Sequence, residues 1–355
     1  MALRPVFQAL EFLRDDPLHT MRIVPDPLPE PARGSVLLKI ERFVLSSNNI
    51  TYARYGDQLG YWAPFPAREH GWGRVPAWGT ARVIGGDSDL AAPGELFYGY
   101  LPMATHVLVE AEPLPSGLRA TSPERSEMYP LYRDMIRMND PVDDVVLATT
   151  GGVAKTAAHL SDEVLASTPA QVVFSSATSR TALTTAVMLR EAGLRVVGLT
   201  AADRAKAAAR AEVFDEVLSY DEIGDLVGIP GTVYVDVAGH AEITAAVART
   251  LGSALARSLQ VGATHPSSEP SAQLSPPGPP VEQFNVGLRR IDVAARIGEE
   301  KMAAFEQAVE EPIAVWAAEH LAVEKVTGLE QVPHVWHRVL RGEVDPLTTA
   351  VIVLS

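Results

Sequence analysis

The chain has 355 residues, no cysteine and a formal net charge of −14. Its length predicts about two domains with a large core, and the lack of cysteine excludes disulfides, thiolate nucleophiles and every zinc site that needs a thiolate. The acidic balance argues against nonspecific binding to nucleic acid or anionic membranes, although a local basic patch can still hold an anionic cofactor. With no long apolar segment for a leader peptide or a membrane span, we expect a cytoplasmic protein with no membrane contact.

Short strands dominate the predicted structure of residues 1–140. Apolar runs bounded by turn residues predict strands at 36–40, 42–45, 79–85, 94–100 and 105–109. Several short strands of this kind are typical of a partly open barrel. Residues 122–140 predict a loop and then a short amphipathic segment, and residues 152–165 predict a helix.

Strand and helix alternate from residue 171 to residue 261. The alternation begins with an apolar run, a polar turn at Ser175–Ser179, a helical pattern that stops at Gly193, and a second apolar run. Further elements are predicted as helix 203–211, strand 216–220, helix 221–227, strand 232–237, helix 240–251 and strand 254–261. This order predicts a doubly wound parallel sheet with helices on both faces.

Three features are predicted after the last of these strands. Residues 263–282 are rich in proline and serine and predict a mobile loop. Residues 299–340 have a helical pattern, and residues 345–354 predict a final strand.

The turn after the first strand of the parallel sheet is the candidate phosphate site. A helix N-terminus binds anions through its N–H groups and its dipole. The residues that offer hydroxyls or charge here are Ser175, Ser176, Thr178, Ser179 and Arg180. The G-x-G-x-x-G fingerprint is absent, which weakens close approach of the backbone to a phosphate. The alternative is an ordinary turn in which serine and threonine only cap the helix. The surrounding alternation favours phosphate binding.

The end of the second strand bears on the choice of cofactor. Enzymes that use NAD place an acid there for the ribose hydroxyls, but this chain has Thr200, followed by Arg204 and Lys206. A hydroxyl with nearby cations suits the 2′-phosphate of NADP(H) better. The alternative is that these cations only lie on a solvated face of a helix.

Four stretches resemble segments of the medium-chain dehydrogenase/reductase superfamily. They are 36–56, 94–100 (GELFYGY), 232–239 (TVYVDVAG) and 339–353. The stretches WGRVPAWGTARVIG, ELFYGYLPMATHVLV and FSSATSRTA are similar to a cysteine-poor branch of unknown function, DUF2855. The zinc-binding cysteines of alcohol-dehydrogenase-like members are missing, so the resemblance implies the zinc-free quinone-oxidoreductase and enoyl-reductase side and no metal.

The resemblance also implies an architecture. A GroES-like, partly open β-barrel domain would comprise residues 1–140 and 290–355, and a Rossmann domain would comprise residues 141–289. A substrate would bind in a cleft between them. A homodimer through the edge of the Rossmann sheet is implied as well.

Candidate catalytic residues come from the segment that lines the cleft in that superfamily. Without zinc, the Tyr52 hydroxyl or the Asn48 amide could hydrogen-bond a substrate carbonyl and stabilise the enolate that hydride transfer forms. Tyr132, just before the Rossmann domain, could reach a carbonyl or a carboxylate. The alternatives are that Asn48 and Tyr52 cap a turn and pack, and that Tyr132 lies on a surface helix.

Aromatic residues between the predicted strands are a second feature that bears on the substrate. They are Tyr61, Trp62, Phe65, Trp72 and Trp78. Such a cluster suggests an apolar wall for a planar or hydrophobic substrate, and core packing is the alternative.

These features predict a zinc-independent, NADP(H)-dependent oxidoreductase that acts on a carbonyl compound, a conjugated enone or a quinone. The first alternative is a non-redox enzyme that acts on a hydrophobic carbonyl compound with the same fold. The second is a non-catalytic binding protein, because fold alone does not decide function.

Overall fold

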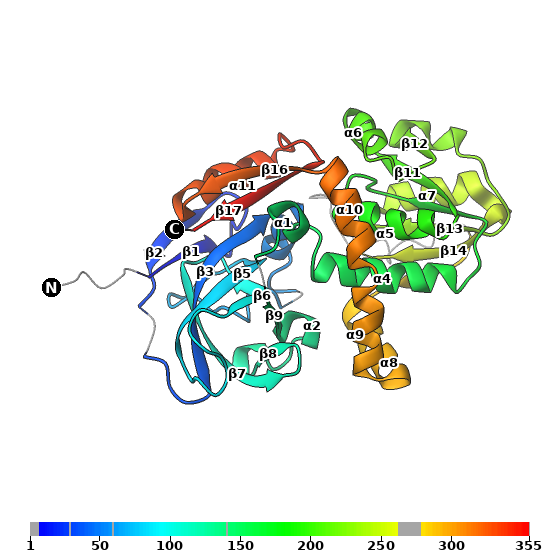
Figure 1. Ribbon diagram of the computed structural model, residues 1–355. Coiled ribbons are helices and arrows are strands. Elements are labelled where there is room, and N and C mark those ends of the chain that lie inside the picture. The colour runs from blue at the N-terminus through cyan, green and yellow to red at the C-terminus, as the bar shows by residue number, and fades with distance from the viewer. Residues whose placement is uncertain (1–6, 28–29, 59, 140, 262–277, 355) are drawn as a thin grey trace. The chain divides into compact units, whose positions relative to one another are not determined.

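The computed structural model describes residues 7–27, 30–58, 60–139, 141–261 and 278–354. Within them the chain forms two compact units (Figure 1). The first unit takes in the residues up to 147, residues 323–344 and those from 348 onward, and the second takes in residues 148–322 and 345–347.

The first unit is built on an antiparallel barrel. Its strands are β1 (Gln8–Leu13), β2 (Met21–Pro25), β3 (Ser35–Leu45), β4 (Trp72–Gly73), β5 (Pro76–Gly86), β6 (Leu96–Pro102), β7 (His106–Leu114), β8 (Gly117–Ala120), β9 (Asp134–Met138), β16 (Ala322–Thr327) and β17 (Thr348–Val353). The main sheet runs β16-β17-β3-β5-β6-β9-β8-β7, and β3 also pairs with β7, which closes the barrel. A smaller sheet has the order β2-β1-β4.

Strand β3 differs from its prediction in one respect. The sequence predicts two strands, 36–40 and 42–45, whereas β3 is continuous. Glu41 lies at a register shift between β3 and β5, and its carboxylate pairs with Arg82 at 2.6 Å. A bulge therefore accommodates the polar residue that interrupts the apolar pattern.

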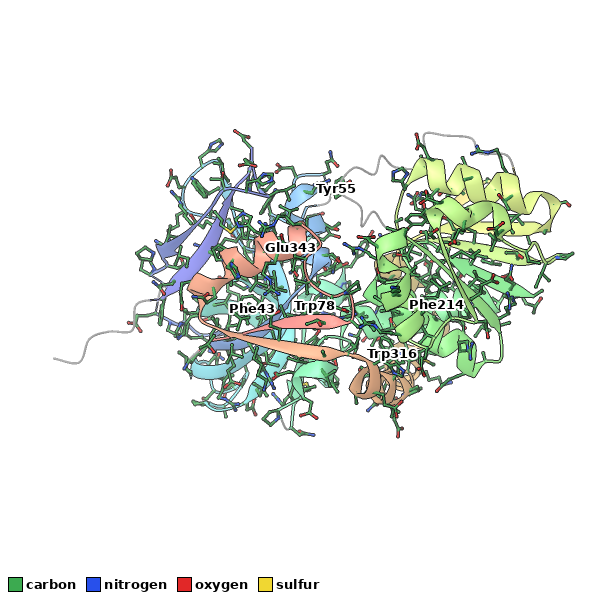
Figure 2. The ribbon with its side chains drawn as sticks, turned by 90° about the horizontal axis from the view of Figure 1, so that it is seen from above. Phe43, Tyr55, Trp78, Phe214, Trp316 and Glu343 are labelled. Atoms are coloured by element: carbon green, nitrogen blue, oxygen red, sulfur yellow. The ribbon has the colours of Figure 1, made fainter. Side chains whose placement is uncertain are left out.

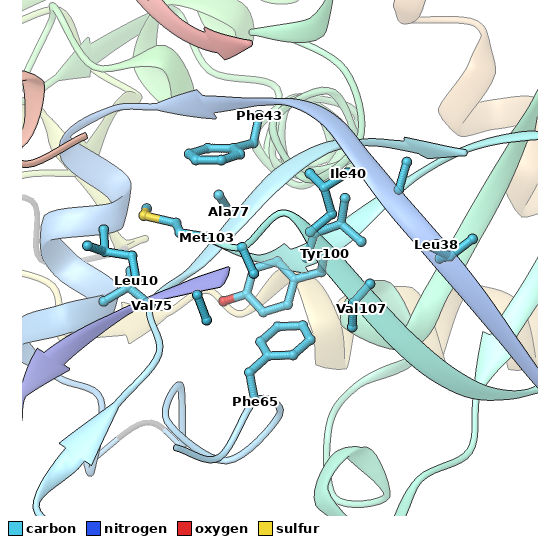
Figure 3. Close-up of a cluster of buried hydrophobic side chains, with 14 of the residues drawn as sticks. Leu10, Leu38, Ile40, Phe43, Phe65, Val75, Ala77, Tyr100, Met103 and Val107 are labelled. Carbon is cyan, nitrogen blue, oxygen red and sulfur yellow. The ribbon is translucent and has the colours of Figure 1, made fainter. Parts of the chain in front are cut away.

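Short helices complete this unit. They are α1 (Ser47–Arg54), η1 (Pro123–Arg125), α2 (Pro130–Arg133), α3 (Asp144–Leu147), η6 (Leu329–Gln331) and α11 (Val332–Leu340). Buried side chains from distant strands fill the barrel, and Figure 3 shows Leu10, Leu38, Phe43 and Val75 among them. Trp336 of α11 joins this core: its ring lies 4.7 Å from that of Phe12, and its indole N–H donates to the Leu18 carbonyl.

The second unit is a parallel α/β sheet. Its strands are β10 (Gln171–Phe174), β11 (Arg195–Thr200), β12 (Glu216–Ser219), β13 (Thr232–Asp236), β14 (Leu255–Gln260) and β15 (Val281–Gln283), in the order β12-β11-β10-β13-β14-β15. Every pairing within this order is parallel. The chain winds outward in both directions from β10 and β13, so the topological switch point lies between these two strands.

Helices cover both faces of the parallel sheet. They are α4 (Gly152–Leu165), α5 (Arg180–Glu191), η2 (Ala202–Arg204), α6 (Ala205–Arg210), η3 (Tyr220–Asp225), α7 (Ala241–Leu251) and η4 (Gly252–Ala254). Apolar residues of η3 and α7 pack on one face with Val173 and Val197, and α5 lies on the other face (Figure 1). The predicted fold class, a doubly wound Rossmann sheet with an antiparallel barrel, is confirmed.

The last fifth of the chain differs from the prediction. Residues 290–355 are expected to return to the barrel, but α8 (Val286–Ile297), α9 (Glu299–Gln307) and α10 (Glu310–His320) belong to the second unit and pack on α4 and α5. A buried cluster explains this: Glu306 of α9 accepts from Arg290 and contacts His159 of α4 at 2.8 Å. The return to the barrel begins only at residue 323.

Residues 299–340 are expected to be helical throughout, but β16 interrupts them because Val323 and Val326 favour an edge strand beside β17. Lys325 pairs with Asp144 at 2.6 Å and fixes this edge. Most of the proline- and serine-rich stretch 263–282 lies outside the described residues, and its last residues begin β15.

Candidate functional site

The turn between β10 and α5 lies at the carboxyl edge of the parallel sheet. Ser179 is the N-cap of α5, and its hydroxyl accepts a hydrogen bond from the Ala182 N–H at 3.2 Å. The turn is tight, because the Ser179 N–H donates to the Ser176 carbonyl at 2.8 Å. Ser176 has φ of +51°, the left-handed conformation that usually favours glycine. The backbone thus takes the shape of a glycine-containing loop without a glycine.

The Ser175 hydroxyl has three partners inside the protein. It donates to the Asp236 carboxylate at 2.7 Å and accepts from the Val237 and Ala238 N–H groups at 2.8 and 2.9 Å. A hydroxyl has one proton and two acceptor positions, so this set uses its full capacity. Ser175 therefore joins the ends of β10 and β13 across the switch point, and its proton is not available to a phosphate while these bonds stand.

Asp236 is the centre of this buried network. Besides Ser175, its carboxylate accepts from the Gly239 N–H at 2.9 Å and from the Thr244 hydroxyl at 3.0 Å. Burial raises the pKa of Asp236, and the hydrogen bonds oppose that shift. The network fixes the backbone of two neighbouring strand ends, which is where ligands bind in this class of sheet.

Tyr220 is a residue of this edge that the sequence patterns did not indicate. Its hydroxyl accepts a hydrogen bond from the Ser176 N–H at 2.9 Å. Burial raises the pKa of Tyr220, while the Ser176 bond and the charge of Arg204 lower it. Tyr220 directly follows β12, and its place beside the first turn depends on the pairing of β10, β11 and β12.

The other predicted cofactor residues lie on the same edge of the sheet. Thr178 and Thr200 are buried, Arg204 is partly exposed and Lys206 is exposed. The Arg180 guanidinium donates to the Pro346 carbonyl at 2.8 Å, and burial lowers its pKa to about 10, so it remains a cation at neutral pH.

Replacing Ser176 tests the left-handed conformation. We expect Ser176→Gly to leave the free energy of unfolding unchanged or to raise it by up to about 1 kcal/mol, because glycine removes left-handed strain but adds chain entropy to the unfolded state. Ser176→Val is expected to lower it by about 1–2 kcal/mol. Urea denaturation measures both, and equal losses in the two variants would contradict this explanation.

A tyrosine cluster occupies the barrel unit. Tyr52 lies on α1, and its hydroxyl oxygen accepts from the Asn48 side-chain amide at 2.7 Å. The helix is held by a capping box between Ser46 and Asn49, and the Asn49 amide donates to the Pro76 carbonyl of β5 at 2.9 Å. These bonds fix α1, and with it Tyr52, against the barrel.

The structure brings all three catalytic candidates into this cluster. Tyr52 touches Asn48 directly, and its ring lies 5.6 Å from that of Tyr100, which in turn lies 5.1 Å from that of Tyr132. Trp78, labelled in Figure 2, lies 6.0 Å from Tyr132. Tyr132, on α2, is therefore partly buried and packs against the cluster.

Burial sets the chemistry of these phenols. It raises the pKa of Tyr52, Tyr61, Tyr100 and Tyr132, with neighbouring phenols adding to the shift in all but Tyr61. All four stay protonated at neutral pH, so they can donate hydrogen bonds and cannot act as bases.

Sequence patterns also missed Tyr100 and Arg125. Tyr100 lies on β6 in an unbroken buried run, and Arg125 lies on the short turn η1 with 3% of its surface exposed. Its guanidinium lies 4.4 Å from the ring centre of Phe65. No local pattern distinguishes a buried arginine in a turn from the solvated arginines that turns usually carry.

Two features are not found in the described part of the chain. No group of three or more histidine, aspartate and glutamate side chains is placed there to hold a metal ion. No helix there has the length and apolar character that crossing a membrane requires.

The family of the chain follows from a sequence comparison. The model of a family described as "Protein of unknown function (DUF2855)" matches residues 43–345. The chain belongs to the DUF2855 family. None of the curated proteins matches the sequence of this DUF2855 protein.

Solved structures resemble this DUF2855 protein over nearly its whole length. CurA from Vibrio vulnificus in complex with NADPH is 15% identical with a TM-score of 0.62, over 98% of this chain and 99% of that one. Mycobacterial Rv1454c complexed with NADPH is 16% identical with a TM-score of 0.61, over the same shares. JamJ enoyl reductase in its apo form is 13% identical with a TM-score of 0.63, over 99% and 100%. The DUF2855 protein thus has the medium-chain dehydrogenase/reductase fold.

Proposed function

We propose that this DUF2855 protein is an NADP(H)-dependent oxidoreductase that transfers hydride between the nicotinamide and a carbonyl compound, a conjugated enone or a quinone. The observation that carries the proposal is the tight, left-handed turn that leads into α5 at the switch point of the sheet. Its support from outside the chain is that two similar structures are complexes with NADPH.

The residues of the turn fit a dinucleotide in part. The first turn of α5 points N–H groups toward the carboxyl edge of the sheet, where a pyrophosphate would be held. Arg204 and Lys206 would hold the 2′-phosphate, because Thr200 stands at the end of β11, where enzymes that use NAD place an acid. The Ser175 hydroxyl, which is bonded to Asp236, and the Ser176 N–H, which is bonded to the Tyr220 hydroxyl, would support this backbone. Neither group would contact the phosphate.

In the barrel unit, Tyr52 would polarise the substrate. Asn48 donates to the Tyr52 oxygen, so the phenolic proton points away from Asn48 and can be donated to a carbonyl oxygen. The bound cofactor would supply the hydride. As negative charge develops on the carbonyl oxygen, a fixed donor in an apolar site stabilises it more than water does.

Cofactor selectivity tests the assignment of the cations. We expect Arg204→Ala with Lys206→Ala to weaken NADPH binding roughly 10- to 100-fold, because charge-assisted bonds to the 2′-phosphate are lost, and to leave NADH binding unchanged. Lys301→Ala, an exposed lysine on α9 of the same unit, is the matched control. Fluorescence titration measures both cofactors, and no NADPH binding by the wild type at millimolar concentration would sink the proposal.

A non-redox reaction on a hydrophobic carbonyl compound is the second candidate. The engagement of the Ser175 hydroxyl and the Ser176 N–H favours it, because both groups are withdrawn from a phosphate. The tyrosine cluster would then act only by donating hydrogen bonds to the substrate. Turnover of an enone or ester in the complete absence of nicotinamide would favour this reading over hydride transfer.

A further inference from the structure

Arg125 is a buried cation that pairs with no carboxylate of the described residues. Three arginines are buried among the described residues, and two of them are paired: Arg74 with Asp26 at 3.0 Å and Arg290 with Glu306 at 2.5 Å. No described carboxylate forms an ion pair with Arg125, and its Nη1 atom has no hydrogen-bond partner among the described residues. Among the described residues, the other two buried guanidiniums are thus compensated and that of Arg125 is not.

The charge of Arg125 persists despite burial. Burial lowers its pKa to about 10, with the charge of the exposed Glu124 acting in the opposite direction, so it is protonated at neutral pH. The Phe65 ring beneath it offers a cation–π contact. Such a contact offsets part of the desolvation cost of a buried cation, and the orphaned N–H group adds to that cost.

Tyr100 supplies a second buried polar group in the same place. Its ring lies 6.4 Å from that of Phe65, and Figure 3 shows the two side chains next to each other in the barrel core. Its hydroxyl is buried without a hydrogen-bond partner among the described residues. The Phe65 ring is thus a common neighbour of the Arg125 guanidinium and the Tyr100 ring.

The turn that carries Arg125 is short and locally bonded. The turn η1 is held by local backbone bonds, from Arg125 to the Ser122 carbonyl and from Met128 to the Arg125 carbonyl. Glu124 and Ser126 on either side are exposed. Loop motions occur on the nanosecond to microsecond timescale, and binding of a small molecule at Arg125 requires such a motion of η1.

We propose that Arg125 and Tyr100 bind the carboxylate of a small molecule with an apolar, planar body. A guanidinium fork matches a carboxylate with two parallel bonds, and a phenol adds a third donor. One monoanion neutralises the one unpaired cation, whereas a phosphate dianion would leave excess negative charge among aromatic rings. The proposal deepens the proposed function, on which it rests, by adding a carboxylate to its carbonyl or enone substrate.

Binding of benzoate and cinnamate to the full chain without nicotinamide tests this inference, with benzamide and cinnamamide as neutral probes of the same shape. Isothermal titration calorimetry should detect the acids and not the amides. Arg125→Met should weaken acid binding roughly 10- to 100-fold and Tyr100→Phe by less. Tyr234→Phe, which removes another buried hydroxyl without a partner in the described chain, is the matched control and should bind the acids as the wild type does.

Thermal stability separates ligand binding from a structural role. If Arg125 is kept for a ligand, Arg125→Met should melt at the same or a higher temperature than the wild type. Failure of the wild type to bind either acid, equal binding of acids and amides, or unchanged acid binding by Arg125→Met would each overturn the proposal. If Arg125→Met does not fold, Arg125 has a structural role and the proposal fails. Because nicotinamide is absent, these results are independent of NADPH binding.

Discussion

Asp236→Ala is expected to lower the free energy of unfolding of this DUF2855 protein by about 3–5 kcal/mol. The substitution leaves the Ser175 hydroxyl, the Gly239 N–H and the Thr244 hydroxyl buried without their acceptor. Because these groups hold the ends of β10 and β13, the turn at Ser176 should loosen as well. Urea denaturation gives the free energy, and any NADPH affinity should fall with it.

Asp236→Asn separates shape from charge at this position. The amide oxygen can still accept from Ser175 and Gly239, and the amide nitrogen can donate to Thr244, so we expect a loss of about 1 kcal/mol or less. Burial raises the pKa of Asp236. The folded state therefore holds this proton more tightly than the unfolded state, and wild-type stability should fall relative to Asp236→Asn as pH rises above about 4.

The exposed Asp225 provides the control for both variants. Asp225→Ala should change stability by no more than about 0.5 kcal/mol. Equal stability of Asp236→Ala and the wild type would show that the network does not hold the switch point.

Glu306→Gln is expected to lower the free energy of unfolding by about 3–5 kcal/mol. The Glu306 carboxylate accepts from Arg290 and contacts His159, and all three side chains are buried. A neutral amide leaves the Arg290 charge without compensation inside the packing of α4, α8 and α9. Glu300→Gln, an exposed glutamate on the same helix, is the matched control.

The contribution of Glu306 to wild-type stability depends on pH with the opposite sign to that of Asp236. Burial raises the pKa of Glu306, but hydrogen bonds from His159 and Arg290 outweigh it and lower the pKa to about 2. The stabilisation is present above the unfolded pKa of about 4.3 and is lost as pH falls toward 2. Acid titration of stability should therefore show a steeper loss in the wild type than in Glu306→Gln, and parallel curves would contradict the pairing.

The elements that were predicted well rest on local patterns. The run Gln171–Phe174, the helix that stops before Gly193 and the strand Thr232–Asp236 follow from periodicity and a terminating glycine. The misplaced segments are those where a distant partner decides. β16 is a strand because β17 offers it an edge, and α8 to α10 remain in the second unit because Glu306 meets His159, 147 residues earlier.

The candidate site shows the same division. The sequence by itself determined the strand–turn–helix unit, the missing glycines, the missing acid at Thr200 and the absence of cysteine, because each is a property of one short stretch. Only the tertiary structure decided that Ser175 bonds Asp236, 61 residues away, and that Arg125 lies on Phe65 beside Tyr100. Hydrogen-bond partners and burial depend on which strands become neighbours, and periodicity carries no information about them.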